Sequence, residues 1–252
     1  AFGRFSIHYT HADDLYPEVA AEAEKTTVSC PVPQRPLLLD YTYPFESEGT
    51  LPAKVTVTEI KRRRQEPETD SIYLYPRPAF LREGSGKLTA AEAGTALHTV
   101  LEGLDYHRCD DIQNLQAQID AAVQGGRLTE KEAETVSAQK LLRFMQSPIG
   151  KRLQYAETVR REVSFSLLTS AQELLMQPGQ VLMQGMIDCV LFEKEGISIL
   201  DYKTDRGKPP EELAERYRVQ LDCYAKAAET LFAQKVMHKY LYLFAYDMLL
   251  EV

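Results

Sequence analysis

VLMQGMIDCVLFEKEGISILDYKT, residues 181–204, is the stretch from which the architecture of this chain can be read. It holds two apolar runs, Val181–Phe192 and Ile197–Thr204, each with the length and composition of a strand. Only Glu193–Gly196 separates the two runs. Because such a short connection joins antiparallel neighbours, the stretch predicts a β-hairpin.

Charged side chains interrupt both apolar runs. Asp188 lies in the middle of the first run, and Asp201 and Lys203 lie two residues apart in the second, so those two point to the same side of a strand. A turn centred on Lys194 and Glu195 places Asp188 directly opposite Asp201, about 5 Å apart at Cβ. A turn shifted by one residue places Asp188 opposite Lys203. Both registers keep the three side chains on one face.

These three residues allow two interpretations. Two carboxylates this close repel each other unless a cation joins them, and an all-oxygen site suits Mg²⁺. A lysine beside that ion can orient a water or stabilise a phosphate, so the group fits phosphodiester hydrolysis by in-line attack of a metal-activated water. The other interpretation is a buried ion pair, Asp201–Lys203 or Asp188–Lys203, that only holds the hairpin together.

His98 lies in a predicted helix that begins at the capping box Thr89–Glu92 and runs to about Leu104. Gly94 lies one helical turn earlier on the same face. A glycine inside a helix costs roughly 1 kcal/mol against alanine, so Gly94 predicts the close approach of a DNA backbone or a neighbouring strand. His98 is either a third metal ligand, which would widen the site toward Mn²⁺, or an ordinary surface or core histidine.

Three further polar residues lie on neighbouring elements. Glu162, on a predicted strand, is either an accessory carboxylate of the site or the partner of an adjacent arginine. Gln220 and Tyr224 are four residues apart on a predicted helix and therefore share one face. They either contact a DNA strand by hydrogen bonding and stacking, or pack at the helix edge with one hydrogen bond.

The whole pattern predicts an α/β fold with a mixed central sheet and flanking helices. The strand–helix–strand crossover at its end predicts a parallel pair, and the hairpins predict antiparallel pairs. The expected order is a helix, three strands, a helix and a strand. The expected elements are a strand at 55–58, a helix capped by Thr58 through 64, an extended segment at 73–81, helices at 89–104 and 129–146, a short helix from Pro148, strands at 160–168, 181–192 and 197–204, a helix at 211–232 and a strand at 239–246.

Residues 1–53 differ from the remainder. They hold six of the 13 prolines and a net charge of −5 out of the chain's −8, with no long periodic segment beyond a possible short helix at 13–25. Such a composition predicts a linker or docking arm ahead of a globular domain at 54–252. The absent initiator Met indicates a piece of a longer protein.

Bulk features disfavour several classes of protein. No apolar run reaches the length of a membrane span, and residues 1–10 lack the layout of a secretory signal. Four scattered cysteines indicate reduced thiols in a cytoplasmic setting and no zinc or iron–sulfur site. Gly84–Lys87 lacks the spacing of a P-loop, so we expect no bound nucleotide. The net charge of −8 argues against general, charge-driven binding to nucleic acid.

Four segments, in this order, resemble the motifs of RecB-type nucleases, which belong to the PD-(D/E)XK, restriction-endonuclease-like superfamily. The similarity is closest to the C-terminal nuclease domains of the AddA components of AddAB helicase–nucleases, and it covers roughly residues 54–246. The segments are Gly94–His98, Gln184–Asp188, Asp201–Asp205 and Gln220–Tyr224, supported by Val57–Lys61, Arg77–Phe80, Arg161–Phe165 and Lys239–Tyr242.

The resemblance implies a restriction-endonuclease-like fold and a magnesium-dependent site, with Mn²⁺ as a substitute. Implied metal ligands are His98, Asp188, Asp201 and the backbone carbonyl of Tyr202. Lys203 would be catalytic alongside the two aspartates. Gln220 and Tyr224 would face DNA, and we add Arg206 and Gly94 as candidate DNA contacts. Relatives with an iron–sulfur cluster carry a cysteine group after the Gln/Tyr motif, and this chain has only Cys223 there.

The function expected from this resemblance is that of a DNA exonuclease domain. It would cut single strands delivered by a helicase region upstream on the same polypeptide, in double-strand break processing for recombinational repair in the bacterial cytoplasm. An AddB-type second subunit would be the protein partner, with no membrane involved. Tethering to a motor would also explain the acidic balance, because it supplies a high local concentration of DNA. The alternative is a non-catalytic module that keeps the nuclease fold for subunit docking and strand guidance.

Overall fold

The computed structural model describes residues 49, 51–65, 88–156 and 158–252, all within the compact unit Pro44–Val252. The predicted helix at 13–25, the extended segment at 73–81 and nearly all of the predicted linker lie outside the described residues. Within the described ranges, no helix combines the length and apolarity needed to cross a membrane.

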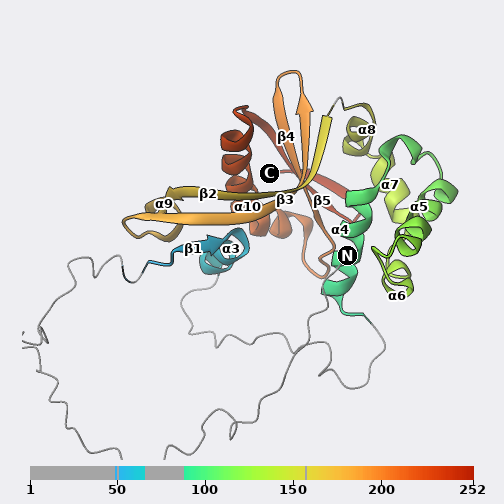
Figure 1. Ribbon diagram of the computed structural model, residues 1–252, viewed down its shortest axis with the longest axis horizontal. Coiled ribbons are helices and arrows are strands. Elements are labelled where there is room, and N and C mark those ends of the chain that lie inside the picture. Colours follow the sequence, from blue (N-terminus) through green and yellow to red (C-terminus); the bar gives the residue numbers. More distant parts are fainter. Residues whose placement is uncertain (1–48, 50, 66–87, 157) are drawn as a thin grey trace, which may run out of the picture. The chain divides into compact units, whose positions relative to one another are not determined.

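A six-stranded mixed sheet forms the centre of the described unit (Figure 1). Its strand order is β1-β3-β4-β5-β6, and β2 also pairs with β3. The β3–β4 hairpin is antiparallel and the β4–β5 crossover is parallel, which confirms both predictions. The strands are β1 (Lys54–Thr56), β2 (Thr158–Ser170), β3 (Gln180–Glu193), β4 (Gly196–Lys203), β5 (Val236–Leu243) and β6 (Met248–Glu251).

Helices account for most of the remaining described chain. They are α3 (Val57–Gln65), α4 (Ala90–Gly103), the 3₁₀ helix η2 (Tyr106–Arg108), α5 (Ile112–Gln124), α6 (Glu130–Ala133), α7 (Ala138–Gln146), α8 (Pro148–Tyr155), α9 (Ala171–Leu175) and α10 (Pro210–Phe232). The capping box at the start of α4 is confirmed, because the Thr89 side chain accepts the Glu92 N–H and the Glu92 carboxylate accepts the Thr89 N–H.

Three sequence-based expectations about elements were wrong. The single helix expected at 129–146 is split into α6 and α7, because the Ser137 side chain accepts the Lys140 N–H and starts a new helix. The cap of α3 is Thr56, whose Oγ1 accepts the Glu59 N–H, and Thr58 lies inside the helix. The strand expected at 239–246 begins at Val236 and ends at Leu243, where a turn leads into the unexpected strand β6.

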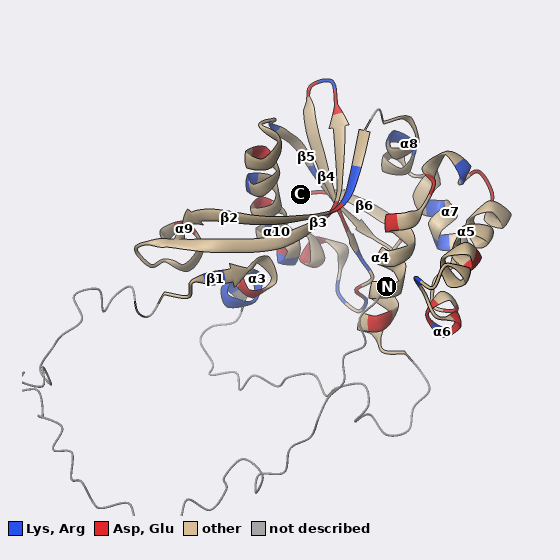
Figure 2. Ribbon diagram, viewed as in Figure 1, with Lys and Arg blue, Asp and Glu red and all other residues tan. Residues whose placement is uncertain are grey.

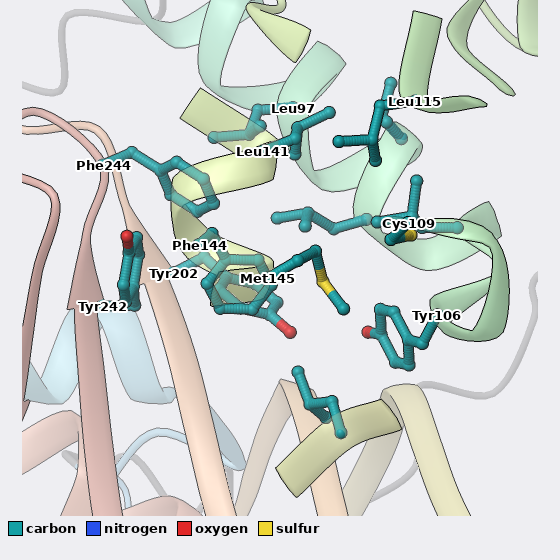
Figure 3. Close-up of a cluster of buried hydrophobic side chains, with 14 of the residues drawn as sticks. Leu97, Tyr106, Cys109, Leu115, Leu141, Phe144, Met145, Tyr202, Tyr242 and Phe244 are labelled. Carbon is teal, nitrogen blue, oxygen red and sulfur yellow. The ribbon is translucent and has the colours of Figure 1, made fainter. Parts of the chain in front are cut away.

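Helix α5 was missed although its sequence carries a signal. Asp111 caps it by accepting the Asn114 N–H, and Leu115, Ile119 and Ala122 recur at helical spacing and are buried. With α4, α7 and α8, this helix packs on one face of the sheet, around Phe144 (Figure 3). Within this layer, α4 lies against β4, where His98 contacts the backbone carbonyl of Tyr202.

Side chains of β4 alternate between two cores on opposite faces of the sheet. Leu200 and Tyr202 join the cluster beneath α4 to α8, whereas Ile197 and Ile199 join the cluster beneath α3 and α10. Period-two alternation therefore sends Asp201 and Lys203 toward α10. The sheet is the middle of three layers, and the end of β4 is where polar residues from both outer layers meet.

Candidate active site

Two strands, β1 and β4, pair with different parts of the same edge of β3. Its opposite edge is occupied by β2 along almost its whole length, so β1 at Leu182–Gln184 and β4 at Cys189–Glu193 must lie on the same side. The β3–β4 ladder pairs Glu193 with Gly196, which is the first of the two registers that the sequence left open, with the turn at Lys194 and Glu195. Pairing ends one step before Asp188, at the place where the edge passes from β4 to β1.

Asp188 closes the gap left where the ladder ends. Its Oδ2 accepts a 2.8 Å hydrogen bond from the Tyr202 N–H, so the side chain replaces a backbone partner for β4. The residue is 8% exposed, and this bond offsets part of the cost of burying a carboxylate. The other oxygen, Oδ1, is left to face α4.

His98 and Glu162 meet Asp188 at this point. His98 Nδ1 lies 3.6 Å from Asp188 Oδ1 and 3.7 Å from Glu162 Oε1, and one ligand atom from each of the three residues falls within 4.8 Å of the others. Glu162 is left out of the β2–β3 pairing, and its backbone there is left-handed, with a φ of 46°. Such a backbone costs about 1 kcal/mol or more, which suits a residue held for function.

The electrostatics of His98 favour a positive charge between its ring and the two carboxylates, either a proton on Nδ1 or a metal ion. His98 Nε2 lies 3.2 Å from the Tyr202 carbonyl oxygen, so it donates its proton there. A neutral imidazole would then turn the bare lone pair of Nδ1 toward two carboxylates, which is repulsive unless a proton or a metal ion intervenes. Burial lowers the pKa of His98, but Glu162 and Asp188 outweigh it and raise that pKa above the ordinary value.

The donor atoms of the cluster fit a divalent metal. One imidazole nitrogen, two carboxylates and a nearby backbone carbonyl are a donor set for Mg²⁺ or Mn²⁺. Among the described residues, this is the one group of three or more histidine, cysteine, aspartate or glutamate side chains close enough to hold an ion. Cys109, Cys189 and Cys223 are buried free cysteines and are not members of this group.

Asp201 and Lys203 form the ion pair that the sequence allowed. Lys203 Nζ lies 2.5 Å from Asp201 Oδ2, and Asp201 is fully buried. The pair is not isolated, because Lys203 Nζ also donates to the Tyr202 carbonyl oxygen at 3.1 Å, the same atom that His98 contacts. The ion pair and the three-residue cluster therefore share one acceptor, the Tyr202 carbonyl oxygen. Figure 2 shows acidic and basic residues close together where β2, β3 and β4 converge.

Burial and charge act in opposite directions on this pair. Burial lowers the pKa of Lys203, but the carboxylates of Asp201 and Asp188 outweigh it and raise the pKa, so the ammonium stays charged. Burial raises the pKa of Asp201 although Lys203 opposes this. Asp201 Oδ2 accepts no hydrogen bond of ordinary geometry from the described residues. Its role as a metal ligand stays a prediction.

Gln220 and Tyr224 lie beneath Asp201 on α10. Gln220 Nε2 donates to Asp201 Oδ1 and to the Tyr224 hydroxyl, each at 3.0 Å. The two residues are 5% and 6% exposed, so neither offers a surface to solvent in this structure. Their DNA-facing role stays a prediction, and the observed contacts make them a support for Asp201.

Gly94 and Arg206 flank the end of β4. A Cβ at Gly94 would lie 3.4 Å from Thr204 Oγ1, which is an ordinary contact, so a neighbouring strand end does approach here without requiring glycine. Arg206 lines a pocket of about 760 Å³ that also includes Thr204 and Asp205, next to Lys203. DNA contacts at both positions stay predictions.

Replacing Gly94 by alanine should stabilise the folded chain. The new methyl group has room, and alanine is better than glycine in a helix interior by about 0.8–1 kcal/mol. We expect Gly94→Ala to raise the free energy of unfolding by roughly that amount in urea titrations followed by circular dichroism. A loss of stability would show that the backbone at Gly94 is under a constraint that its contacts do not reveal.

Sequence reasoning overlooked two neighbours of this site. Lys61 of α3 donates to Gln220 Oε1 at 3.4 Å and lies 4.2 Å from the centre of the Tyr217 ring. Tyr217 in turn donates to Asp205 Oδ2 at 2.9 Å. Lys61 ended a segment that supported the resemblance, but no role could be given to it before α3 was placed against α10.

Comparison with known proteins agrees with this geometry. Residues 72–249, more than half of the chain, match the sequence profile described as "PD-(D/E)XK nuclease superfamily". The chain is 39% identical over 223 residues to an ATP-dependent helicase/nuclease subunit from Acetivibrio thermocellus, covering 82% of this chain and 17% of that protein.

Two further relatives carry the same name. The one from Pelotomaculum thermopropionicum is 41% identical over 225 residues, covering 82% of this chain and 18% of that protein. The one from Desulforudis audaxviator is 34% identical over 271 residues, covering 95% of this chain and 22% of that protein. The chain thus spans less than a quarter of the length of the relatives it matches.

Proposed function

This chain belongs to the PD-(D/E)XK nuclease superfamily, and on that premise we propose that it is a divalent-metal-dependent deoxyribonuclease acting on single-stranded DNA. The observation that carries the proposal is the His98–Glu162–Asp188 cluster, which shares the Tyr202 carbonyl with the Asp201–Lys203 pair. A structural ion pair alone would not need three further ligand-type side chains converging on it.

The residues divide the chemical work between them. Asp188 and Glu162 would supply the negative charge that holds Mg²⁺, or Mn²⁺ as a substitute, and His98 would supply a nitrogen donor. When bound, the ion supplies Lewis acidity that makes a nearby water more acidic and offsets charge on the phosphate. Lys203 keeps its proton and is placed to stabilise negative charge that develops on the scissile phosphate.

Asp201 and Gln220 hold this arrangement in place. Asp201 fixes the Lys203 ammonium, and Gln220 fixes the Asp201 carboxylate from α10. Because Gln220 also donates to the Tyr224 hydroxyl, the amide is held at three points, including Lys61. Prior ordering of charged groups is what makes them effective, because no reorganisation is needed during the reaction.

The relatives' name suggests the wider setting. We propose that the chain is the exonuclease part of an ATP-dependent helicase/nuclease, in which a helicase region delivers the single strands. Processing of DNA double-strand breaks for recombinational repair, an AddB-type partner and a bacterial cytoplasmic location belong to the same proposal.

Cleavage of labelled single-stranded DNA tests the proposal. We expect the purified chain to cut the strand with Mg²⁺ or Mn²⁺ and to stop with EDTA. Lys203→Gln, which keeps a donor for Asp201 but loses the charge, should cut about 10²-fold more slowly. Unfolding curves of both proteins serve as the control for folding. Metal-independent cleavage, or equal rates for the two proteins, would sink the site assignment, and no cleavage by either would favour a docking module.

A further inference from the structure

We propose that Lys61 is a phosphate-binding residue that holds the DNA backbone beside the phosphate being cut. The inference rests on the proposed function and adds a contact outside the metal cluster. Lys61 is carried by α3, a helix whose sequence position is far from every residue of that cluster. It would give the strand a second anchor on the α10 side of the sheet.

Contacts place the Lys61 ammonium next to the catalytic lysine. Lys61 Nζ lies 4.2 Å and Lys203 Nζ lies 5.0 Å from the centre of the same aromatic ring, that of Tyr217. A hydrogen bond of 3.4 Å links Lys61 to Gln220, which bonds to Asp201. Both ammonium groups therefore lie against the Tyr217 ring, and they are close enough that the charge of Lys203 contributes to lowering the pKa of Lys61.

Lys61 forms no ion pair within the described part of the chain, although the more distant charges of Asp201 and Asp205 favour its protonated form. No carboxylate there lies within 4.0 Å of its Nζ, whereas Lys203 is paired with Asp201. Two other basic residues of the same helix are engaged elsewhere, since Arg63 pairs with Glu59 and Arg64 donates to the Glu173 carbonyl. Among the described residues this half-buried ammonium contacts only an amide oxygen and an aromatic ring, so its hydrogen-bonding capacity is incompletely satisfied.

The surroundings of Lys61 strengthen this conclusion. Burial, followed by the charges of Lys203 and Arg216, lowers the pKa of Lys61 to about 8. The group is still mostly protonated at pH 7, but its positive charge is held at a cost in free energy. An incoming phosphate would remove that cost, because opposite charge favours the protonated form. Lysine is a common point-charge partner for phosphate.

Salt dependence of DNA binding tests the role of Lys61. Fluorescence anisotropy with a labelled oligothymidylate, in EDTA to prevent cutting, gives the slope of log K against log salt concentration. Loss of one phosphate contact should reduce that slope by about 0.7 for a single strand. We expect this loss in Lys61→Gln and in Lys61→Met, which keeps an apolar stem over Tyr217, and a slope like the wild type in Lys61→Arg.

Lys151→Gln is the matched control, because Lys151 is exposed on α8 and has the same charge. An unchanged slope in both neutral Lys61 variants would overturn the inference even if their cleavage slows, since that result would make Lys61 a positioning residue for Gln220. An equal loss in Lys151→Gln would also overturn it, as a general charge effect. Absence of binding by the wild type overturns it too, while the cleavage assay separately decides whether the proposed nuclease function stands.

Discussion

Asp188→Asn is expected to reduce the rate of DNA cleavage by at least about 10³-fold without unfolding the chain. The amide is nearly the same size as the carboxylate and can still accept the Tyr202 N–H through its oxygen, so the β4 contact survives. What is lost is the negative charge that faces His98 Nδ1 at 3.6 Å. The rate is measured with single-stranded DNA at saturating Mg²⁺ and again with Mn²⁺.

Calorimetry should show the cause of the lost activity. We expect Asp188→Asn to lose divalent ion binding and His98→Ala to weaken it, because one removes charge and the other a neutral donor. Glu195→Gln, the same chemical change at the exposed hairpin turn, should bind metal and cut DNA like the wild type. Wild-type metal binding in both Asp188→Asn and His98→Ala would remove the two residues from the metal site.

Gly150→Ala is expected to destabilise the fold by on the order of 3 kcal/mol. A Cβ at this position would lie 2.2 Å from the Phe144 carbonyl oxygen and 2.5 Å from Met145 Cα, and these are backbone atoms. They cannot yield without moving Phe144, which is fully buried and packs edge-on against Tyr202 and Tyr242. Denaturant titration measures the change directly.

Gly94→Ala is the natural comparison for that variant. Both changes add one methyl group to a helix, but only the methyl group at position 94 has space. Both variants gain helix propensity, so opposite signs of the two changes in the free energy of unfolding would show that the clash at position 150 outweighs that gain. If Gly150→Ala were as stable as the wild type, the α7–α8 junction must be able to open without cost, contrary to its close packing.

Local sequence signals were sufficient to predict the elements that begin or end at a clear cap, turn or proline. The antiparallel hairpin followed from a four-residue connection, although its register did not, the start of α4 from its capping box, and α10 from a long apolar stripe after two prolines. Where the N-cap residue was not recognised, as at Ser137 and Thr56, the predicted helix boundaries were wrong. These are errors of a few residues, and they leave the sheet order unchanged.

The sequence could also group Asp201 with Lys203, because residues two apart on a strand must share a face. It could not place Glu162, because the direction of that side chain depends on the left-handed backbone of Glu162 itself. It could not place Lys61 either, because Lys61 contacts Gln220, which is 159 positions away in the sequence. It left two interpretations of Gln220 and Tyr224 open, and packing adds that both are buried beneath Asp201, while their DNA-facing role stays a prediction.

Period and spacing thus determine which side chains share a face, since that information is carried by neighbours along the chain. They do not determine which faces meet, because contacts between distant elements depend on packing two cores around one sheet. The hairpin could be predicted from residues 181–204. The meeting of α4, β2 and β3 around His98, and of α3 with α10 around Tyr217, required the tertiary structure.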